Sequence, residues 1–140
     1  MKSKLIVLLK FSPLLFLIGL FVFNLFNYGV LDDPGKVLYK HYCADCHGEN
    51  GEGIKQLIPP LKNSDMALTH FDSIACWIKN GMSHQITVNG KVYEQTMYPI
   101  KINAVETANV INYISKEFLQ SDKLTTSAKV TEQFKKCTSD

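Results

Sequence analysis

Arginine is absent from residues 32–140, although this stretch carries 12 lysines and 13 carboxylates. The stretch has a net charge of −1, so the +2 of the whole chain comes from lysines near the N-terminus. Proteins that bind nucleic acids present a basic face, on which arginine forks hold phosphates and bases. Because such a face is missing here, we predict no nucleic-acid partner.

Charged residues are also absent from a long run near the N-terminus. Residues 11–31, FSPLLFLIGLFVFNLFNYGVL, contain none, and at about 1.5 Å per residue a helix of this length spans a hydrocarbon layer of about 30 Å. The flanking charges are Lys2, Lys4 and Lys10 before the run and Asp32 and Asp33 after it. Because positive charge favours the cytoplasmic side, we predict that residues 1–31 form a transmembrane anchor and that the rest of the chain lies outside the cytoplasm.

A cleavage motif is missing as well. A secretory signal peptide has a short apolar region and small residues in an A-x-A-like pattern before the cut. Residues 24–31, NLFNYGVL, hold no such pattern, and Lys10 interrupts an apolar region that begins at Leu5. No cysteine lies near the end of the run for lipid attachment. We therefore favour a retained anchor, or an uncleaved signal, over a cleaved signal peptide.

Cysteine is scarce, with four residues among 140. In a domain outside the cytoplasm, four cysteines allow two disulfides, one disulfide with two cysteines bound to another group, or a metal site. The chain length and the 46% hydrophobic content suit one compact domain, which we place at residues 32–120. Residues 121–140 are a polar tail, in which Val130 and Phe134 suggest a short helix.

The first two cysteines follow a predicted helix. Asp33 can cap the free amides of a helix start, and Pro34 suits the first helical position. Apolar residues then recur at helical spacing up to Cys43. If the helix continues, Cys43 and Cys46 share one face, with His47 on the same side. The three side chains would then converge on one object.

Two further elements are predicted in the middle of the chain. A helix at residues 73–80, SIACWIKN, takes Asp72 as its cap and ends at Gly81. A hairpin at residues 86–93 has Asn89-Gly90 as its two-residue turn.

A longer helix is predicted at residues 104–118. Asn103 and Glu106 form a capping-box-like start. Its apolar positions at helical spacing are Val105, Val110, Ile111, Ile114 and Phe118. Such a stripe needs another element to cover it.

The sequence Cys-Ala-Asp-Cys-His at residues 43–47 has three interpretations. A thiol redox pair needs a helix that begins at the cysteines and lowers the thiol pKa, whereas this pair follows a helix. A zinc site usually needs a second ligand pair about 12 to 20 residues later, but the next cysteine, Cys76, is alone. Covalent haem uses all three residues, because Cys43 and Cys46 form thioethers with the vinyl groups and His47 binds the iron. We therefore predict one molecule of haem c.

Several other stretches resemble those of a known family. They are LYKHYCADCHGENGEG, the Pro59-Pro60-Leu61 segment, Met97 close to a proline, and the closing helix ANVINYI. Over about residues 33–119 the domain resembles a class I c-type cytochrome of the membrane-anchored bacterial type. The resemblance implies an all-α cytochrome c fold, with three to five helices around one covalent haem, a short hairpin-like loop and the N-terminal transmembrane helix. It also implies that the helix before the haem motif crosses the last helix and covers its apolar stripe.

The resemblance also implies roles for individual residues. The Pro59 carbonyl accepts the ring N–H of His47 and fixes the ring. Met97 is the second axial ligand of the iron, although the family usually places proline directly after this methionine and here one tyrosine intervenes. The alternative ligands are Met82 first, and then His84, Met66 and His70.

An electron carrier, and not an enzyme, is the function that the resemblance implies. Iron bound by both His47 and Met97 has no open position for a substrate. We expect a monohaem cytochrome c of the bacterial inner membrane, single-pass, with its haem domain in the periplasm, that carries single electrons between a redox protein donor and an acceptor of a respiratory chain. The alternatives are a permanent haem subunit of a larger membrane dehydrogenase or reductase complex, and an open-site haem peroxidase or gas sensor.

Cys76 and Cys137 are left without a role in the haem motif. In an oxidising compartment they are candidates for a disulfide that ties the C-terminal tail to the helix at residues 73–80. The alternative is that Cys76 is a small buried apolar residue and Cys137 a free thiol. The disulfide is the hypothesis that we carry forward.

Overall fold

The computed structural model describes residues 2–27 and 32–137. The chain divides into two units, one at residues 1–32 and one at residues 33–140. Each unit is described by itself.

The N-terminal unit consists of one helix, α1 (Lys2–Asn27), which includes Pro13. Large apolar side chains such as Leu15 and Phe21 are each 66% exposed along it. The predicted transmembrane segment at residues 11–31 overlaps this helix. The last four residues of the segment, 28–31, lie outside the described part of the chain. Among the described residues, no helix has both the length and the apolar character needed to cross a membrane.

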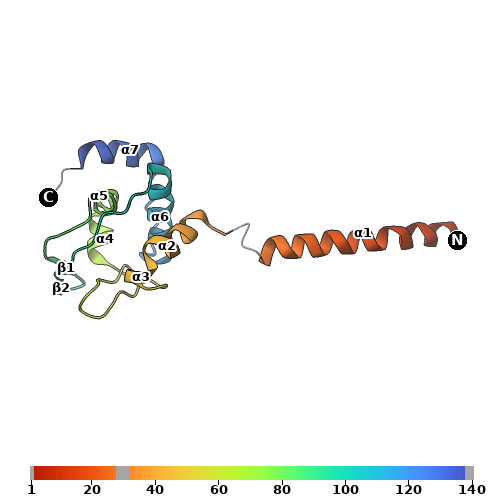
Figure 1. Ribbon diagram of the computed structural model, residues 1–140, viewed down its shortest axis with the longest axis horizontal. Helices are drawn as coiled ribbons and strands as arrows, with labels where there is room; N and C mark the ends of the chain where they lie inside the picture. The colour runs from red at the N-terminus through yellow and green to blue at the C-terminus, as the bar shows by residue number, and fades with distance from the viewer. Residues whose placement is uncertain (1, 28–31, 138–140) are drawn as a thin grey trace. The chain divides into compact units, whose positions relative to one another are not determined.

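Two helices, α2 (Pro34–Tyr42) and α6 (Ala104–Glu117), pack against each other in the second unit (Figure 1). The carboxylate of Asp33 caps α2 by accepting the Gly35 N–H at 2.7 Å. Gly35 lies against the Asn109 carbonyl oxygen of α6, where a Cβ atom has no room. Tyr39 is fully buried at this contact, with its ring 4.8 Å from the ring of Phe118. The apolar stripe of α6 therefore has α2 as its partner.

The start of α6 agrees with the predicted capping box. The Asn103 side chain accepts the N–H groups of Val105 and Glu106, and the Glu106 carboxylate accepts the Asn103 N–H at 2.8 Å. Val110 and Ile111 are at most 2% exposed, as the stripe requires. Val105 is an exception, because it is 57% exposed and belongs to the solvent side of the first turn.

The middle of the domain contains a helix that the sequence analysis did not predict. This helix, α4 (Asp65–Thr69), is capped by the Ser64 hydroxyl, which accepts the Ala67 N–H at 3.2 Å. A 3-10 turn, η1 (Phe71–Ser73), leads into α5 (Ile74–Asn80). The prediction that Asp72 caps this helix is wrong, because the residue before α5 is Ser73 and no side chain caps it. The Asp72 carboxylate instead forms an ion pair with Lys129 at 2.6 Å.

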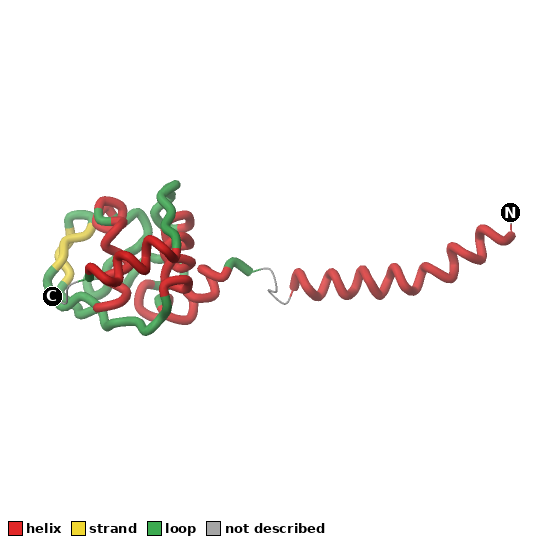
Figure 2. Tube along the Cα trace, turned by 90° about the horizontal axis from the view of Figure 1, so that it is seen from above, coloured by secondary structure: helices red, strands yellow, loops and turns green. Residues whose placement is uncertain are grey.

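The predicted hairpin is present as β1 (Ile86–Val88) and β2 (Lys91–Tyr93), which pair antiparallel. Asn89 and Gly90 take positive φ values of 51° and 74°, as a tight two-residue turn requires. The tip is fixed to the start of α4, since the Asn89 N–H donates to the Asp65 carboxylate at 2.8 Å and the Asp65 N–H donates to the Asn89 side chain at 3.1 Å. Figure 2 shows the hairpin in yellow at the edge of a largely helical unit.

The tail forms a helix, α7 (Ser127–Lys136), which packs against α5 and α6. Val130 is fully buried in the core. The disulfide between Cys76 and Cys137 is present and joins the end of α7 to α5. With α3 (Ala44–His47), the described part of the second unit contains six α-helices. Five of them, α2 to α6, lie in residues 32–120, within the three to five expected, and α7 is the short helix predicted for the tail.

Candidate functional site

The Cys-Ala-Asp-Cys-His sequence lies at a break between two helices. α2 ends at Tyr42, and Cys43 leaves helical geometry with φ −121° before α3 begins at Ala44. The chain still turns on itself, because the His47 N–H donates to the Cys43 carbonyl at 2.8 Å. Cys43 is 8% exposed and Cys46 is exposed, and neither belongs to a disulfide. Both thiols are therefore available to react with another group.

The loop after α3 brings Pro59 to the histidine ring. The His47 carbonyl accepts the Gly53 N–H at 2.7 Å, and the Gly51 carbonyl accepts the Leu61 N–H at 2.8 Å, so the loop folds back over α3. The Nδ1 atom of His47 then lies 3.1 Å from the Pro59 carbonyl oxygen. This is the contact that the resemblance implied. When Nδ1 donates to Pro59, Nε2 is the nitrogen left to bind a metal.

Burial governs the ionisation of this motif. It lowers the pKa of His47, an effect that the hydrogen bond to the Pro59 carbonyl opposes. The imidazole is thus kept in the neutral form that metals bind. Burial also raises the pKa of the Cys43 thiol to about 12, and the neighbouring Cys46 raises it further. In the polypeptide alone, Cys43 is a protonated thiol at neutral pH.

A cavity of about 300 Å³ lies beside the motif. Cys43, Cys46, His47 and Pro59 line it from one side. Its other walls are mainly hydrophobic and come from α5, the hairpin, the Ile58–Leu61 segment, the loop before α6, and α6 itself. They include Ile58, Leu61, Ile74, Trp77, Ile78, Ile86, Val88, Ile100 and Ile114. Free thiols, a neutral imidazole and an apolar cavity together match what a covalently attached haem requires.

Two methionines from different segments meet in the wall of the cavity. Met82 and Met97 both line it. They form an isolated antiparallel bridge, in which each N–H donates to the other's carbonyl at 2.9 Å. Residues paired in this way carry their side chains on the same face. Met97 also packs against the buried core, and this packing favours Met97 over Met82 as the iron ligand.

The other predicted ligands are distributed differently. Met66 and His84 line the cavity, whereas His70 does not and instead lies with its ring 6.4 Å from that of Trp77. Within residues 2–27 and 32–137, no group of three or more histidine, cysteine and acidic side chains could hold a metal ion. The zinc interpretation of residues 43–47 therefore finds no ligand set there.

Sequence reasoning missed several residues of the cavity wall. Trp77 of α5, to which the sequence analysis assigned no role, lines the cavity. Ile86 and Val88 reach the wall from β1, and Ala67 reaches it from the unpredicted α4. Alternation along the hairpin places Ile86 and Val88 on one face of the strand. This alternation is the pattern in the sequence that could have identified them.

Comparison with known protein families identifies the family of the domain. A protein-family model described as "Cytochrome c" matches residues 33–117, which include the motif, the Pro59 segment, both methionines and α6. No curated protein matches the chain.

Proposed function

Because the chain belongs to the cytochrome c family and its domain accordingly carries covalently bound haem c, we propose that it is a membrane-anchored monohaem carrier of single electrons between respiratory partners outside the cytoplasm. A haem electron carrier is the general function of this family. The anchor, the compartment and the partners are the specific parts of the proposal.

The meeting of His47 and Met97 at one cavity is the observation that carries the proposal. In this proposal, Cys43 and Cys46 would hold the haem through two thioethers, and the His47 imidazole and the Met97 sulfur would bind the iron. The haem supplies a one-electron couple between ferric and ferrous iron. With both side chains bound, the iron would have no open position for a substrate.

The other residues of the site orient and shield the iron ligands. Pro59 holds the His47 ring through the 3.1 Å contact at Nδ1, which fixes the ring plane and raises its basicity. The hydrophobic walls exclude water, and an apolar environment keeps the change in solvation during electron transfer small. Methionine as the second ligand favours the reduced iron and raises the potential.

The first test is optical spectroscopy of the haem-loaded protein. The haem is expected to stay attached under denaturing conditions, because thioethers are covalent. The oxidised protein is expected to show the weak near-infrared sulfur-to-iron band, and Met97→Ala should abolish it while Met82→Ala should not. If Met82→Ala alone removes the band, Met82 is the ligand. If the wild type lacks the band and its reduced form binds carbon monoxide, the open-site peroxidase or sensor replaces the carrier.

The membrane anchor is supported by the 21 uncharged residues 11–31 and by the apolar side chains exposed along α1. The location outside the cytoplasm is supported by the Cys76–Cys137 disulfide, because such bonds form mainly in oxidising compartments. After an alkaline carbonate wash the protein should remain in the membrane pellet, and protease added to spheroplasts should digest the haem domain. Release of the protein into the wash would contradict the membrane anchor. Protection of the haem domain from the protease would contradict its location outside the cytoplasm.

A further inference from the structure

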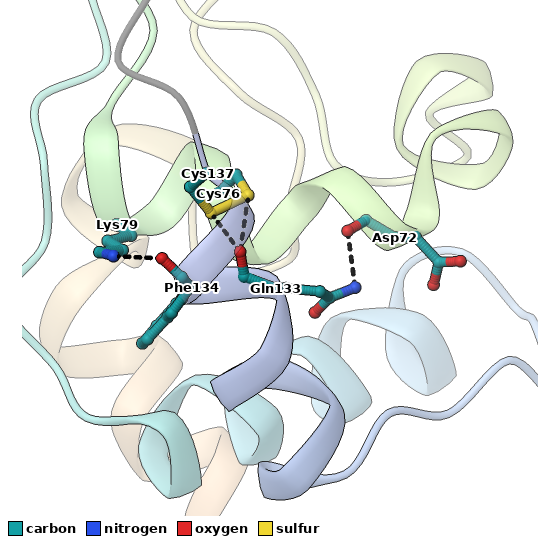
Figure 3. The surroundings of a disulfide bond; sticks show 6 residues. All are labelled: Asp72, Cys76, Lys79, Gln133, Phe134 and Cys137. Atoms are coloured by element: carbon teal, nitrogen blue, oxygen red, sulfur yellow. Dashed lines mark hydrogen bonds between the residues drawn. A yellow bond between two sulfur atoms is a disulfide. The ribbon is translucent and has the colours of Figure 1, made fainter.

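The helix α7 (Ser127–Lys136) lies beyond residues 33–117, the part of the chain that the cytochrome c model matches. It is nevertheless fastened to the η1–α5 segment by several contacts (Figure 3). These are the Cys76–Cys137 disulfide, the Lys79 ammonium donating to the Phe134 carbonyl at 2.7 Å, the Gln133 amide donating to the Asp72 carbonyl at 2.7 Å, and the Lys129–Asp72 ion pair at 2.6 Å. The contacts run along α5 from just before its start to its last turn.

The far end of α5 carries the methionine segment. The Ile78 carbonyl of its last turn accepts the Ile100 N–H at 2.8 Å. Met82 follows α5 after a single residue and exchanges both backbone hydrogen bonds with Met97. The residues that present Met97 to the cavity are therefore held on both sides by α5 or its immediate extension.

Gly81 makes this junction tight. Its φ of 76° and ψ of −172° are open to glycine and strained for other residues. A Cβ atom here would collide with the Met97 carbonyl oxygen. Because the end of α5 lies directly against the Met97 backbone, a displacement of α5 also displaces the methionine segment.

A groove of about 530 Å³ borders the same junction, and it is lined by both cysteines of the disulfide and by both methionines. This open space leaves one side of the junction without close packing. The contacts from α7 therefore constrain α5 at this side of the molecule, in addition to the packing of α5 against α6.

We propose that α7 and its disulfide act as a positioning device for the axial methionine, keeping α5 in place and so keeping Met97 on the iron. The inference rests on the proposed function, since it takes Met97 as the ligand. When the disulfide is absent, α5 moves more freely and Met97 leaves the iron more often. An external ligand that competes with Met97 then binds more tightly, because its apparent affinity scales with the population of the open form.

The test is an imidazole titration of the oxidised, haem-loaded, full-length protein. Binding of imidazole is measured as the loss of the sulfur-to-iron band. The Cys76→Ala/Cys137→Ala variant should bind imidazole about fivefold more tightly than wild type or better, the lower end of typical coupling between distant sites. The matched control is Ile111→Ala, which removes a buried side chain of α6 and leaves α7 and the disulfide in place. It should lower the unfolding midpoint and leave the imidazole affinity unchanged.

Two results overturn the inference: an unchanged imidazole affinity in the double variant, or an equal increase in Ile111→Ala. Failure of the proposed function is distinguishable, because it appears in the wild type as a missing band or as a band that survives Met97→Ala. If the double variant does not accumulate with haem, the wild type can be compared before and after its disulfide is reduced with a phosphine, its thiols are blocked and its iron is reoxidised. The same increase is expected there, and its absence overturns the inference equally.

Discussion

Removing the Cys76–Cys137 disulfide should destabilise the domain by a predictable amount. The bridge joins residues separated by 61 positions. Closing a loop of this length in the unfolded chain restricts its conformational entropy by an amount that corresponds to about 4 kcal/mol at 25 °C. The perturbation is the double variant Cys76→Ala/Cys137→Ala, which leaves the haem cysteines untouched.

Guanidinium unfolding, followed by the haem absorption band and by circular dichroism, measures this loss. With a dependence on denaturant of about 2 to 4 kcal/mol per molar, a loss of about 4 kcal/mol lowers the midpoint by about 1 to 2 M. Either single variant, Cys76→Ala or Cys137→Ala, should lose nearly as much, because each alone breaks the bridge. A reductant should shift the wild type by the same amount and leave the double variant unchanged, since thioethers to haem resist thiol reductants.

An unchanged midpoint in the double variant would refute this reasoning, since it would mean that the bridge does not restrict the unfolded chain. The circular dichroism signal could instead change at a lower guanidinium concentration than the haem absorption band. This result would show that α7 detaches before the rest of the domain unfolds. The stabilisation would then belong to α7 alone and not to the whole loop.

Further predictions concern single positions. Gly81→Ala should weaken or abolish the sulfur-to-iron band, whereas the control Gly90→Ala, also at positive φ but with open space around it, should keep the band. Tyr39→Phe should lower the free energy of unfolding by about 1 to 2 kcal/mol, because the hydroxyl's 2.6 Å hydrogen bond to a backbone carbonyl is lost while the ring packing stays. Ile111→Ala should lower the free energy of unfolding by about 2 to 5 kcal/mol, and Val105→Ala by less than about 0.5 kcal/mol. The reason is that these side chains are 2% and 57% exposed. Equal losses from the two variants would contradict the observed orientation of α6.

Local patterns were sufficient for the elements that begin and end with local contacts. The capping box of Asn103 and Glu106 lies within one turn of chain, so its residues identify the start of α6 directly. The Asn89-Gly90 turn needs positive φ at both residues, which few other pairs adopt. In each case the sequence carries the interaction within a few residues, and prediction and structure agree.

Long-range contacts explain the errors. Asp72 was assigned to a helix cap, but its carboxylate is used by Lys129, which lies 57 positions later. The helix α4 has only five residues, too few for a periodic pattern, and depends on the Ser64 cap and the contact of Asp65 with the hairpin. No local pattern indicates which of these competing partners a side chain takes.

The candidate site divides in the same way. The chemistry of residues 43–47 could be predicted from local sequence, because the spacing of the two cysteines and the histidine suits two vinyl groups and one iron. The contact of His47 with Pro59 crosses 12 positions, and it was foreseen only through the family resemblance. The pairing of Met82 with Met97 was not foreseen, because an isolated bridge between two loops has no periodic signature.

The reciprocal hydrogen bonds between Asp65 and Asn89 have a consequence for the shape of the cavity. They join α4 to the hairpin, and both elements contribute walls to the cavity, through Ala67 and Val88 among others. One pair of exposed side chains therefore ties two separate walls to each other, and the loss of either side chain would loosen both walls at once.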